Sequence, residues 1–307
     1  MTAGPWWGAL PAAGVLLGLT VAGAVLDAVL APAGVESLRG RAGRPLWEAA
    51  RLLRQRRRRI LAADLLLWRL GLAVPLVVAL LMVAVVPFGD RVAADPSVGV
   101  VWFNAMDVLL WAAVWLAGWG ANSVYGLVGG YRFLAQALGY ELPLMFALTA
   151  PAVAAGSLRV ADVVAAQRGL WFVVWMPVAF LVFIAAVSAF SVSGPFSYPS
   201  GRDIAGGILA EPSGVDRLVL LTGRYALLAA GAAMAVALFL GGGAGPLLPG
   251  WLWSLLKTVA LLACLVALRR RMPVLRADRT MRLAWLVVLP ATLAQVLVVA
   301  VVAVKGA

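Results

Sequence analysis

Histidine is absent from this sequence of 307 residues, and Cys264 is its only cysteine. Without histidine the chain cannot ligate haem through imidazole, and most transition-metal sites are excluded as well. A single cysteine can neither form an internal disulfide nor hold an iron–sulfur cluster. No metal site is therefore predicted, and if electrons pass near this chain, their carriers must sit in partner proteins.

Charged residues are also scarce, at 12% of the chain, whereas hydrophobic residues make up 64% and the mean hydropathy is +0.99. A water-soluble domain needs much more polar surface than this. Repeated apolar runs of about twenty residues instead predict an all-α membrane protein that crosses the bilayer several times. Trp6 and Trp7 stand where a secretory signal would carry basic residues, so we expect the first run to remain as a helix.

Eight apolar runs are each long enough to cross about 30 Å of hydrocarbon at helical rise. We expect a single transmembrane domain over residues 1–307. The predicted spans are 9–31, 66–87, 98–118, 133–155, 170–191, 218–240, 251–268 and 283–304. No internal repeat is apparent, which disfavours an independent secondary transporter of the inverted-repeat type.

Basic residues are distributed unevenly among the connections. The net charge of +12, which could suggest a nucleic-acid partner, arises from 25 Lys and Arg against 13 Asp and Glu. Most of these basic residues fall in four alternate connections, at 32–65, 119–132, 192–217 and 269–282. The positive-inside rule places these connections in the cytoplasm and both termini outside. No nucleic-acid partner is expected.

The first cytoplasmic connection contains a short amphipathic segment at 46–55. Leu46, Trp47, Ala50 and Leu53 form its apolar side, so we expect it to lie along the membrane face. The run of four arginines at 56–59 is typical of a stop signal and a contact with anionic lipid. The alternative is that this run docks an acidic partner.

Four ionisable side chains fall within the predicted spans: Asp27, Asp107, Glu141 and Lys257. A charged group at mid-membrane costs about 2.5 kcal/mol or more on insertion scales, so such residues usually face the bundle interior and mark a functional pathway. At helical rise, Asp107 lies about 18 Å and Glu141 about 13 Å from the cytoplasmic end of its span. We therefore expect the two carboxyl groups at a similar depth.

Glu141 is the strongest candidate for a proton relay, with Asp107 as its partner. Carboxyl groups that are buried and close together retain protons more readily, which is the chemistry that a relay needs. Pro143 removes one helical hydrogen bond beside Glu141 and can admit water. The alternative for Glu141 and Asp107 is that each is a structural partner of an arginine or a buried hydroxyl. For Asp27 the alternative is hydration near the cytoplasm, and for Lys257 it is a side chain that extends to the outer surface.

The connection 191–217 is rich in glycine and proline and too long for a simple link between two helices. Asp203 and Glu211 are candidate proton-carrying groups in it, and Phe196 and Tyr198 are candidates to line an apolar cavity. The alternative is a solvated loop that docks a partner.

One stretch carries a family resemblance. Residues 117–143 read A-G-W-G-A-N-S-V-Y-G-L-V-G-G-Y-R-F-L-A-Q-A-L-G-Y-E-L-P. This resembles the pattern A-G-W-x-S-N-x-K-Y-x-L-L-G-A-x-R-x-x-A-Q-x-x-x-Y-E of the H subunit (also numbered subunit 1) of the proton-pumping NADH:quinone oxidoreductases, the respiratory complex I family. G-S-L at 156–158 and R-x-D-x-x-M-x-x-x-W at 276–285 also match, and the eight-span layout fits end to end.

The resemblance implies a subunit in the bacterial inner membrane, at the junction of a membrane arm and a peripheral arm. The partners would be other membrane-arm and peripheral-arm subunits, with NADH, FMN and iron–sulfur clusters held by those partners and quinone as the substrate. Glu141 and Arg132 match the family's carboxylate and arginine. Asp203 and Glu211 would feed protons to Glu141 and Asp107. The side chains assigned to the quinone chamber or its entrance are Arg41, Arg44, Trp47, Phe196 and Arg202.

The sequence departs from the family pattern in the fifth connection. Where the family has P-F-D-L-P-E-A-E-x-E, residues 195–204 read P-F-S-Y-P-S-G-R-D-I, so that four acids become Ser197, Ser200, Arg202 and Ile204. Asp203 restores one acid, one position away. The first loop departs as well, since the family's G-P-N-R-V-G-P is reduced to R-G-R-A-G-R-P at 39–45. Two alternatives follow: a structural anchor that does not pump protons, or the membrane anchor of a formate- or ferredoxin-linked hydrogenase, which also has a shortened first loop.

Overall fold

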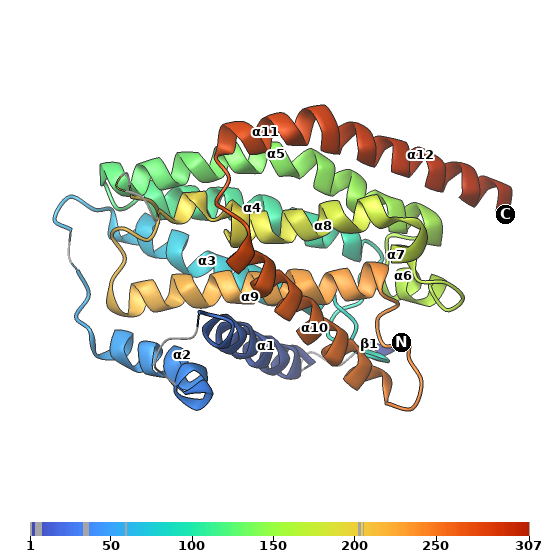
Figure 1. Cartoon of the computed structure of the whole chain (residues 1–307), viewed down its shortest axis with the longest axis horizontal. Coiled ribbons are helices and arrows are strands. Elements are labelled where there is room, and N and C mark those ends of the chain that lie inside the picture. Colours follow the sequence, from blue (N-terminus) through green and yellow to red (C-terminus); the bar gives the residue numbers. More distant parts are fainter. Residues whose placement is uncertain are drawn as a thin grey trace.

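The computed structural model describes residues 2–3, 8–32, 37–58, 60–201, 204 and 206–306. In this part of the chain eight helices are long and apolar enough to cross a membrane, as the sequence predicted. They form one bundle in which both termini lie toward the same end (Figure 1). We call this the terminal end, and we call the opposite end, where α2 lies, the arginine-rich end.

The helices and strands follow one another in a simple order. They are β1 (Thr2–Ala3), α1 (Ala9–Val29), α2 (Leu38–Arg54), α3 (Leu65–Ala84), β2 (Arg91–Val92), α4 (Gly99–Trp119), α5 (Val124–Ala155), α6 (Val160–Ala166), α7 (Phe172–Trp175), α8 (Pro177–Phe190), the 3₁₀ turns η2 (Gly194–Phe196) and η3 (Tyr198–Ser200), α9 (Gly214–Phe239), α10 (Gly250–Arg271), α11 (Ala277–Leu283), the π-helical turn η4 (Ala284–Val288) and α12 (Leu289–Gly306). The strands β1 and β2 pair in parallel over two residues.

Local signals explain where several helices begin and end. The Asp64 side chain caps α3 by accepting hydrogen bonds from two backbone N–H groups, and the Ser37 side chain caps α2 by accepting one. Gly156 closes α5 in the left-handed conformation at φ +62°, which glycine adopts without steric cost. Pro177 separates α7 from α8, because proline lacks an N–H and disfavours helical geometry in Met176 before it.

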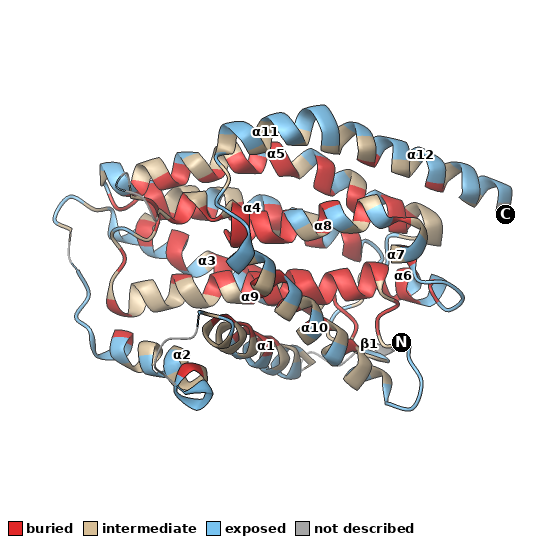
Figure 2. Cartoon of the chain, in the orientation of Figure 1, coloured by how far each residue is buried: buried red, intermediate tan, exposed pale blue. Residues whose placement is uncertain are grey.

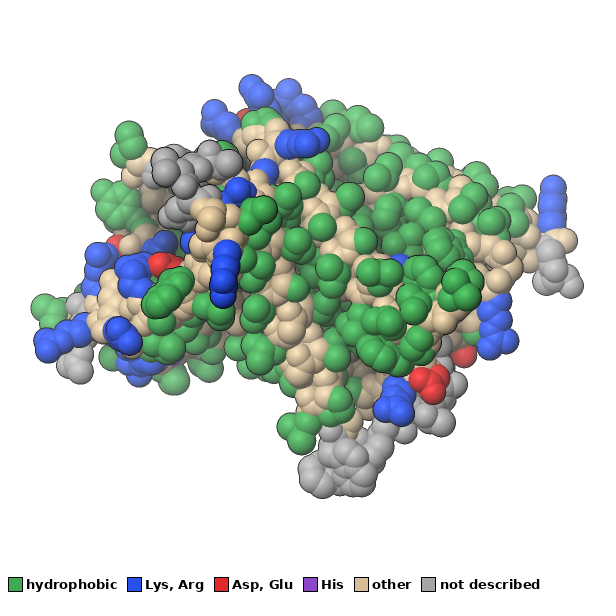
Figure 3. Space-filling model, turned by 60° about the horizontal axis from the view of Figure 1, so that its bottom comes forward, with side chains coloured by type: hydrophobic (Ala, Val, Ile, Leu, Met, Phe, Trp, Pro, Cys, Tyr) green, Lys and Arg blue, Asp and Glu red, His purple; other side chains and the backbone are tan. Residues whose placement is uncertain are grey.

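The helix α9 is the centre of the bundle. Within the chain 78% of its membrane-spanning window is buried, compared with 17% for the last span, which lies along the outside of α5 (Figures 1 and 2). Seven alanines and one glycine occur in α9 between Ala226 and Ala237, and such small side chains let neighbouring helices approach closely. The surface in Figure 3 is largely hydrophobic, as lipid-facing helices require, and Lys and Arg gather toward its left and upper edges.

Several predicted boundaries were wrong. The connection predicted at 119–132 is helical from Val124 onward, because its glycines pack against neighbouring backbone and this packing offsets their low helix propensity. The amphipathic helix predicted at 46–55 begins earlier, at Leu38. The predicted span 170–191 is interrupted at Met176. The connection predicted at 269–282 is reduced to 272–276, because α10 continues to Arg271.

Candidate functional site

Two carboxyl groups from neighbouring helices meet inside the bundle. Asp107 on α4 is completely buried, and Glu141 on α5 is partly buried. The two side chains are close enough to interact electrostatically, so the expected pairing of Asp107 with Glu141 is present in the structure. The Tyr140 hydroxyl donates a hydrogen bond to Asp107 Oδ1 at 3.3 Å, and Asn104 Nδ2 donates one to Glu141 Oε1 at 3.2 Å.

This carboxyl pair, Asp107 and Glu141, has neither a cation nor a full set of donors. No ion pair among the described residues includes either side chain. Asp107 Oδ2, Glu141 Oε2 and Asn104 Oδ1 are buried in the described structure without a hydrogen-bond partner. Two facing carboxylates can only accept hydrogen bonds, whereas one protonated carboxyl group can donate to the other. The arrangement therefore suits a pair that holds a proton.

A close contact between the backbones of α4 and α5 fixes the position of the pair. A Cβ atom on Gly118 would lie 2.6 Å from the carbonyl oxygen of Gly126 and 3.1 Å from the backbone of Gly130. Only glycine permits this approach, since real Cβ contacts are longer. The turn between the two helices spans only residues 120–123, so Gly118 holds them in one register.

Two cavities are lined by residues that hold the carboxyl pair. The inner cavity has a volume of about 110 Å³ and is lined by Tyr140, Phe196, Thr280 and parts of α8, α11 and η4. The outer cavity, about 540 Å³, lies between α4 and α5 toward the terminal end and includes Asn104. Tyr140 thus borders one cavity and Asn104 the other, and each donates a hydrogen bond to a different carboxyl group of the pair.

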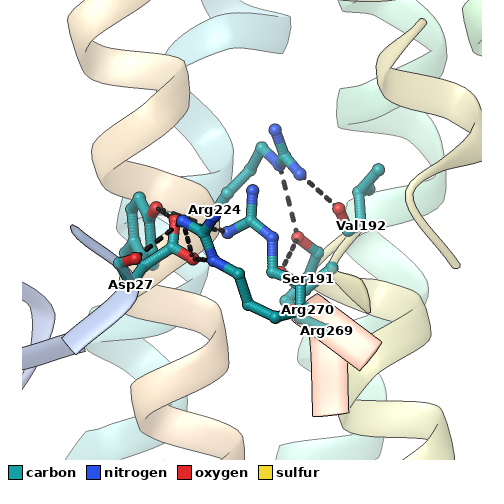
Figure 4. A network of polar contacts seen from close by, with 8 residues as sticks. Asp27, Ser191, Val192, Arg224, Arg269 and Arg270 are labelled. Carbon is teal, nitrogen blue, oxygen red and sulfur yellow. Dashed lines mark hydrogen bonds and ion pairs between the residues drawn. The ribbon is translucent and has the colours of Figure 1, made fainter. Parts of the chain in front are cut away.

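A second charged cluster lies at the arginine-rich end (Figure 4). Asp27 at the end of α1 forms ion pairs with Arg269 at 3.2 Å and Arg270 at 2.9 Å, both from α10. The Tyr225 hydroxyl on α9 donates to Asp27 Oδ2 at 2.7 Å. The residue before it on α9, Arg224, donates to the backbone carbonyls at 191 and 192, at the start of the fifth connection. The alternative that Asp27 is simply hydrated near the cytoplasm is therefore excluded, because its carboxylate is held by side chains of the same chain.

A lateral cavity of about 370 Å³ adjoins this cluster between α1, α2 and α9. Its polar lining includes Asp27, Arg44, Glu48 and Tyr225, and the remaining lining is mostly aliphatic. Glu48 accepts two hydrogen bonds from Arg51, which hold the pKa of Glu48 below its usual value of 4.5. The cavity is large enough for the head of a small apolar ligand and offers it both donors and acceptors.

The residues predicted for the quinone chamber do not all lie at this cavity. Arg44 lines it, whereas Phe196 lies at the inner cavity beside Tyr140. Trp47 is 77% exposed on α2. Arg41 is buried and donates to the carbonyls at 29 and 31, so it holds the end of α1. Arg202, and Asp203 from the predicted proton path, lie outside the described residues.

The fifth connection is folded against the bundle. Arg132 of α5 lies over the Tyr198 ring, 4.0 Å from its centroid, and donates to the carbonyl oxygen of Gly206 at 2.9 Å. Ser197 and Ser200 are buried, and Ser200 Oγ donates to the Ser197 carbonyl. Two positions that carry acids in the family pattern therefore hold neutral side chains inside the protein.

The arginine run has partners within the chain that the sequence did not predict. Arg58 forms an ion pair with Glu211 at 3.2 Å, and Arg57 forms one with Asp216 at 3.6 Å. Glu211, the other predicted proton-feeding acid, also accepts a hydrogen bond from Ser123, just before α5. These contacts tie the first connection to the fifth.

Sequence reasoning missed several polar residues at these sites. The additions are Asn104, Tyr140, Arg224, Tyr225, Arg269 and Arg270. Two signals could have found Asn104 and Tyr140: Asn104 is one helical turn before Asp107 in an apolar run, and Tyr140 directly precedes Glu141. Lys257 reaches the turn at the terminal end and donates to three carbonyls there, in agreement with the outward extension considered from the sequence.

The fold and the carboxyl pair define a multispanning α-helical membrane protein with ionisable side chains inside its bundle. Residues 40–300 match the family model described as NADH dehydrogenase, and the chain belongs to this family. It is 37% identical to H subunit 2 of the NADH-quinone oxidoreductase of Geobacter sulfurreducens over 265 residues, 83% of this chain and 80% of the relative.

Further relatives carry the same description. H subunit 2 of the NADH-quinone oxidoreductase of Cereibacter sphaeroides is 39% identical over 80% of this chain and 78% of its own. The corresponding H subunit of Geobacillus kaustophilus is 36% identical over 78% of this chain and 74% of its own. The family resemblance inferred from the sequence is thereby confirmed.

Proposed function

We propose that this chain is a membrane-arm subunit of a proton-translocating NADH:quinone oxidoreductase in the bacterial cell membrane, where it joins the membrane arm to the peripheral arm. Family membership and the eight membrane-spanning helices support this proposal. In this arrangement partner subunits hold NADH, FMN and the iron–sulfur clusters, and quinone reaches this chain from the lipid as a substrate.

The carboxyl pair is the single observation that supports proton translocation by this chain. Asp107 and Glu141 face each other without a cation, and each has one oxygen without a donor among the described residues. A proton between them supplies the donor and removes the repulsion of two buried carboxylates. If the pair lost that proton and no other arrived, two buried carboxylates would repel each other. The pair is therefore suited to passing a proton from one end of the bundle to the other, and not to holding two permanent negative charges.

The lateral cavity between α1, α2 and α9 is the proposed quinone entrance. Its mostly aliphatic wall suits the isoprenoid chain, and Arg44, one of the lining residues, would donate to a quinone carbonyl oxygen. The exposed side chains of Leu46, Trp47 and Leu53 on α2 provide an apolar surface for the membrane. Arg41 supports the entrance indirectly, because it holds the end of α1 beside α2.

Hydrogen bonds, neighbouring residues of the sequence and one shared cavity wall connect this entrance to the carboxyl pair. Asp27 and Tyr225 line the lateral cavity, and Arg224 next to Tyr225 holds the first residues of the fifth connection. In the same connection Phe196 lies at the inner cavity, beside Tyr140. A change of charge at bound quinone can thus bias the fifth connection and, through it, the environment of Tyr140 and the carboxyl pair.

The variant Glu141→Gln tests the proposal in the assembled complex. Glutamine keeps an oxygen that accepts from Asn104, so we expect normal assembly, while loss of the titratable group abolishes proton uptake coupled to quinone reduction. The measurement is proton uptake by proteoliposomes that contain the complex. Asp90→Asn, which changes an exposed acid between α3 and β2, is the control and should leave uptake unchanged. Wild-type coupling in Glu141→Gln would exclude the role assigned to Glu141.

A second candidate function is a structural anchor that does not pump. The buried neutral side chains of Ser197 and Ser200 favour it, because no carboxyl group stands at these positions to supply protons from the arginine-rich end. If this candidate is correct, the wild-type complex reduces quinone in proteoliposomes without proton uptake, and Glu141→Gln and Asp107→Asn have no effect on that reaction.

A further inference from the structure

The outer cavity forms a groove that runs from the terminal end toward the carboxyl pair. Ser97, Ser157 and Leu158 line it near the terminal ends of α4 and α5, and Asn104 lines it deeper in the bundle. Asn104 is five residues into α4, about 7 to 8 Å at helical rise. Met145, another lining residue, is one helical turn from Glu141 on α5. The groove therefore ends beside the carboxyl pair.

The deep end of the groove is polar and incompletely paired. Asn104 donates to Glu141 Oε1, but Asn104 Oδ1 and Glu141 Oε2 have no partner among the described residues. Buried polar atoms of this kind are usually satisfied by water where space permits. The groove holds about 540 Å³, many times the roughly 30 Å³ that one water molecule occupies in the liquid.

The two sides of the carboxyl pair differ in their access to water. The inner cavity is about one fifth as large as the groove, at about 110 Å³ against about 540 Å³, and Phe196 and Leu275 lie on its wall. Asp107, which receives its hydrogen bond from the inner-cavity residue Tyr140, is completely buried. Glu141 receives its hydrogen bond from Asn104 in the groove and is only partly buried.

We propose that Glu141 exchanges its proton with water at the terminal end through this groove, so that the chain contains its own proton outlet on that side. This inference rests on the proposed function, because it assigns a direction to proton transfer through the carboxyl pair. The proton leaves the Glu141 carboxyl group for water held at Asn104. A second proton then arrives at Asp107 from the arginine-rich side, and Asp107 passes it on to Glu141. The outlet lies within α4 and α5 and needs no ionisable side chain from a partner.

Cysteine accessibility tests the groove in the assembled complex, and the sequence makes the experiment simple. Cys264 is the only cysteine of this chain and is exposed, so Cys264→Ser removes every thiol from this chain. Labelling is read on this chain after the subunits of the complex have been separated, because partner subunits carry cysteines of their own. Val101→Cys and Thr149→Cys then place thiols in the groove. Ala105→Cys is the matched control, since Ala105 is exposed on α4 one turn from Val101 and does not line the groove.

The reagent is a membrane-impermeant methanethiosulfonate, added separately to each side of sealed vesicles. Only a hydrated thiol ionises and reacts, so we expect the two groove cysteines to react at least about tenfold faster than Ala105→Cys, and only from the terminal-end side. Equal rates for all three positions would overturn the proposal, because lipid or a partner helix would then fill the groove.

The outcome is independent of the test of Glu141. If the groove cysteines react but Glu141→Gln still couples proton uptake to quinone reduction, the proposed function fails and access through the groove stands. If Glu141→Gln loses coupling while the groove cysteines stay unreactive, the relay stands and its outlet lies elsewhere, and the inference about the groove is refuted.

Discussion

The chain buries acidic side chains in two places, one with neighbouring cations and one without them among the described residues. Asp27 is surrounded by Arg269, Arg270 and Tyr225, so its negative charge is fully compensated. Among the residues that the structure describes, Asp107 and Glu141 have only a tyrosine, an asparagine and each other as polar partners. One site is built for a permanent charge at the membrane edge, and the other for a group that can be neutral in the membrane interior.

This difference has a functional meaning. A carboxylate held by two arginines can position polar groups around it, as Asp27 does between α1, α9 and α10. A carboxyl group without a cation depends on a proton to be stable at depth. The first site therefore suits structure and electrostatic signalling beside the lateral cavity, and the second suits proton transfer.

The largest expected effect on stability comes from Asp27→Asn. This variant leaves Arg269 and Arg270 without their carboxylate, and removing one member of a largely buried ion pair costs about 3 kcal/mol. We expect a clearly lower Tm of the purified complex. Asp278→Asn, which breaks an exposed pair with Arg276, is the control and should not change Tm. An unchanged Tm in Asp27→Asn would mean that the two acidic sites do not differ as described.

A smaller effect on stability, with a large effect on function, is expected for Asp107→Asn. The new amide still accepts from Tyr140 and can donate toward Glu141, so the free energy of unfolding should change by less than about 1 kcal/mol. Proton uptake coupled to quinone reduction should fall sharply. Measuring Tm and uptake on the same preparation compares this variant directly with Asp27→Asn, and equal destabilisation by the two would contradict the comparison.

The smallest effect concerns Glu48, an acid outside both sites. Its hydrogen bonds with Arg51 lower its pKa, so their contribution to stability is present above pH 4.5 and is lost as the pH falls through the lowered pKa. Both side chains are largely exposed, so the loss should be confined to α2. Infrared titration of the wild type minus Glu48→Gln should place protonation of Glu48 below pH 4.5. Protonation above that pH would contradict the pairing.

The membrane-spanning architecture could be predicted because it depends on local composition. Apolar runs of about twenty residues define the spans. The meeting of Asp107 and Glu141 follows from the short turn between their helices, whereas the depth expected for Glu141 was counted from Arg132 and α5 begins at Val124. The polar turn before α5 was predicted to be too long, because Gly126, Gly129 and Gly130 indicate a loop when the segment is considered without its neighbours. Their helical structure depends on the backbone of α4 and of residue 207, which lie outside the segment itself.

The partners of charged side chains could not be predicted for the same reason. Arg58 and Glu211 are separated by 153 residues, and Asp27 and Arg270 by 243. A run of arginines has the same composition whether it meets lipid, a partner or the same chain. Only the folding of the fifth connection onto the bundle decides that Arg57 and Arg58 are paired internally.

The contact at Gly118 determines which motions can accompany proton transfer. Because the α4 backbone touches the α5 backbone there, neither helix can slide along the other without a collision. The distance between Asp107 and Glu141 must then change through rotation of side chains, not through movement of helices. Rotations of side chains are faster by orders of magnitude than collective shifts of helices. Transfer between the two carboxyl groups should therefore follow a change at the quinone site without waiting for the bundle to rearrange.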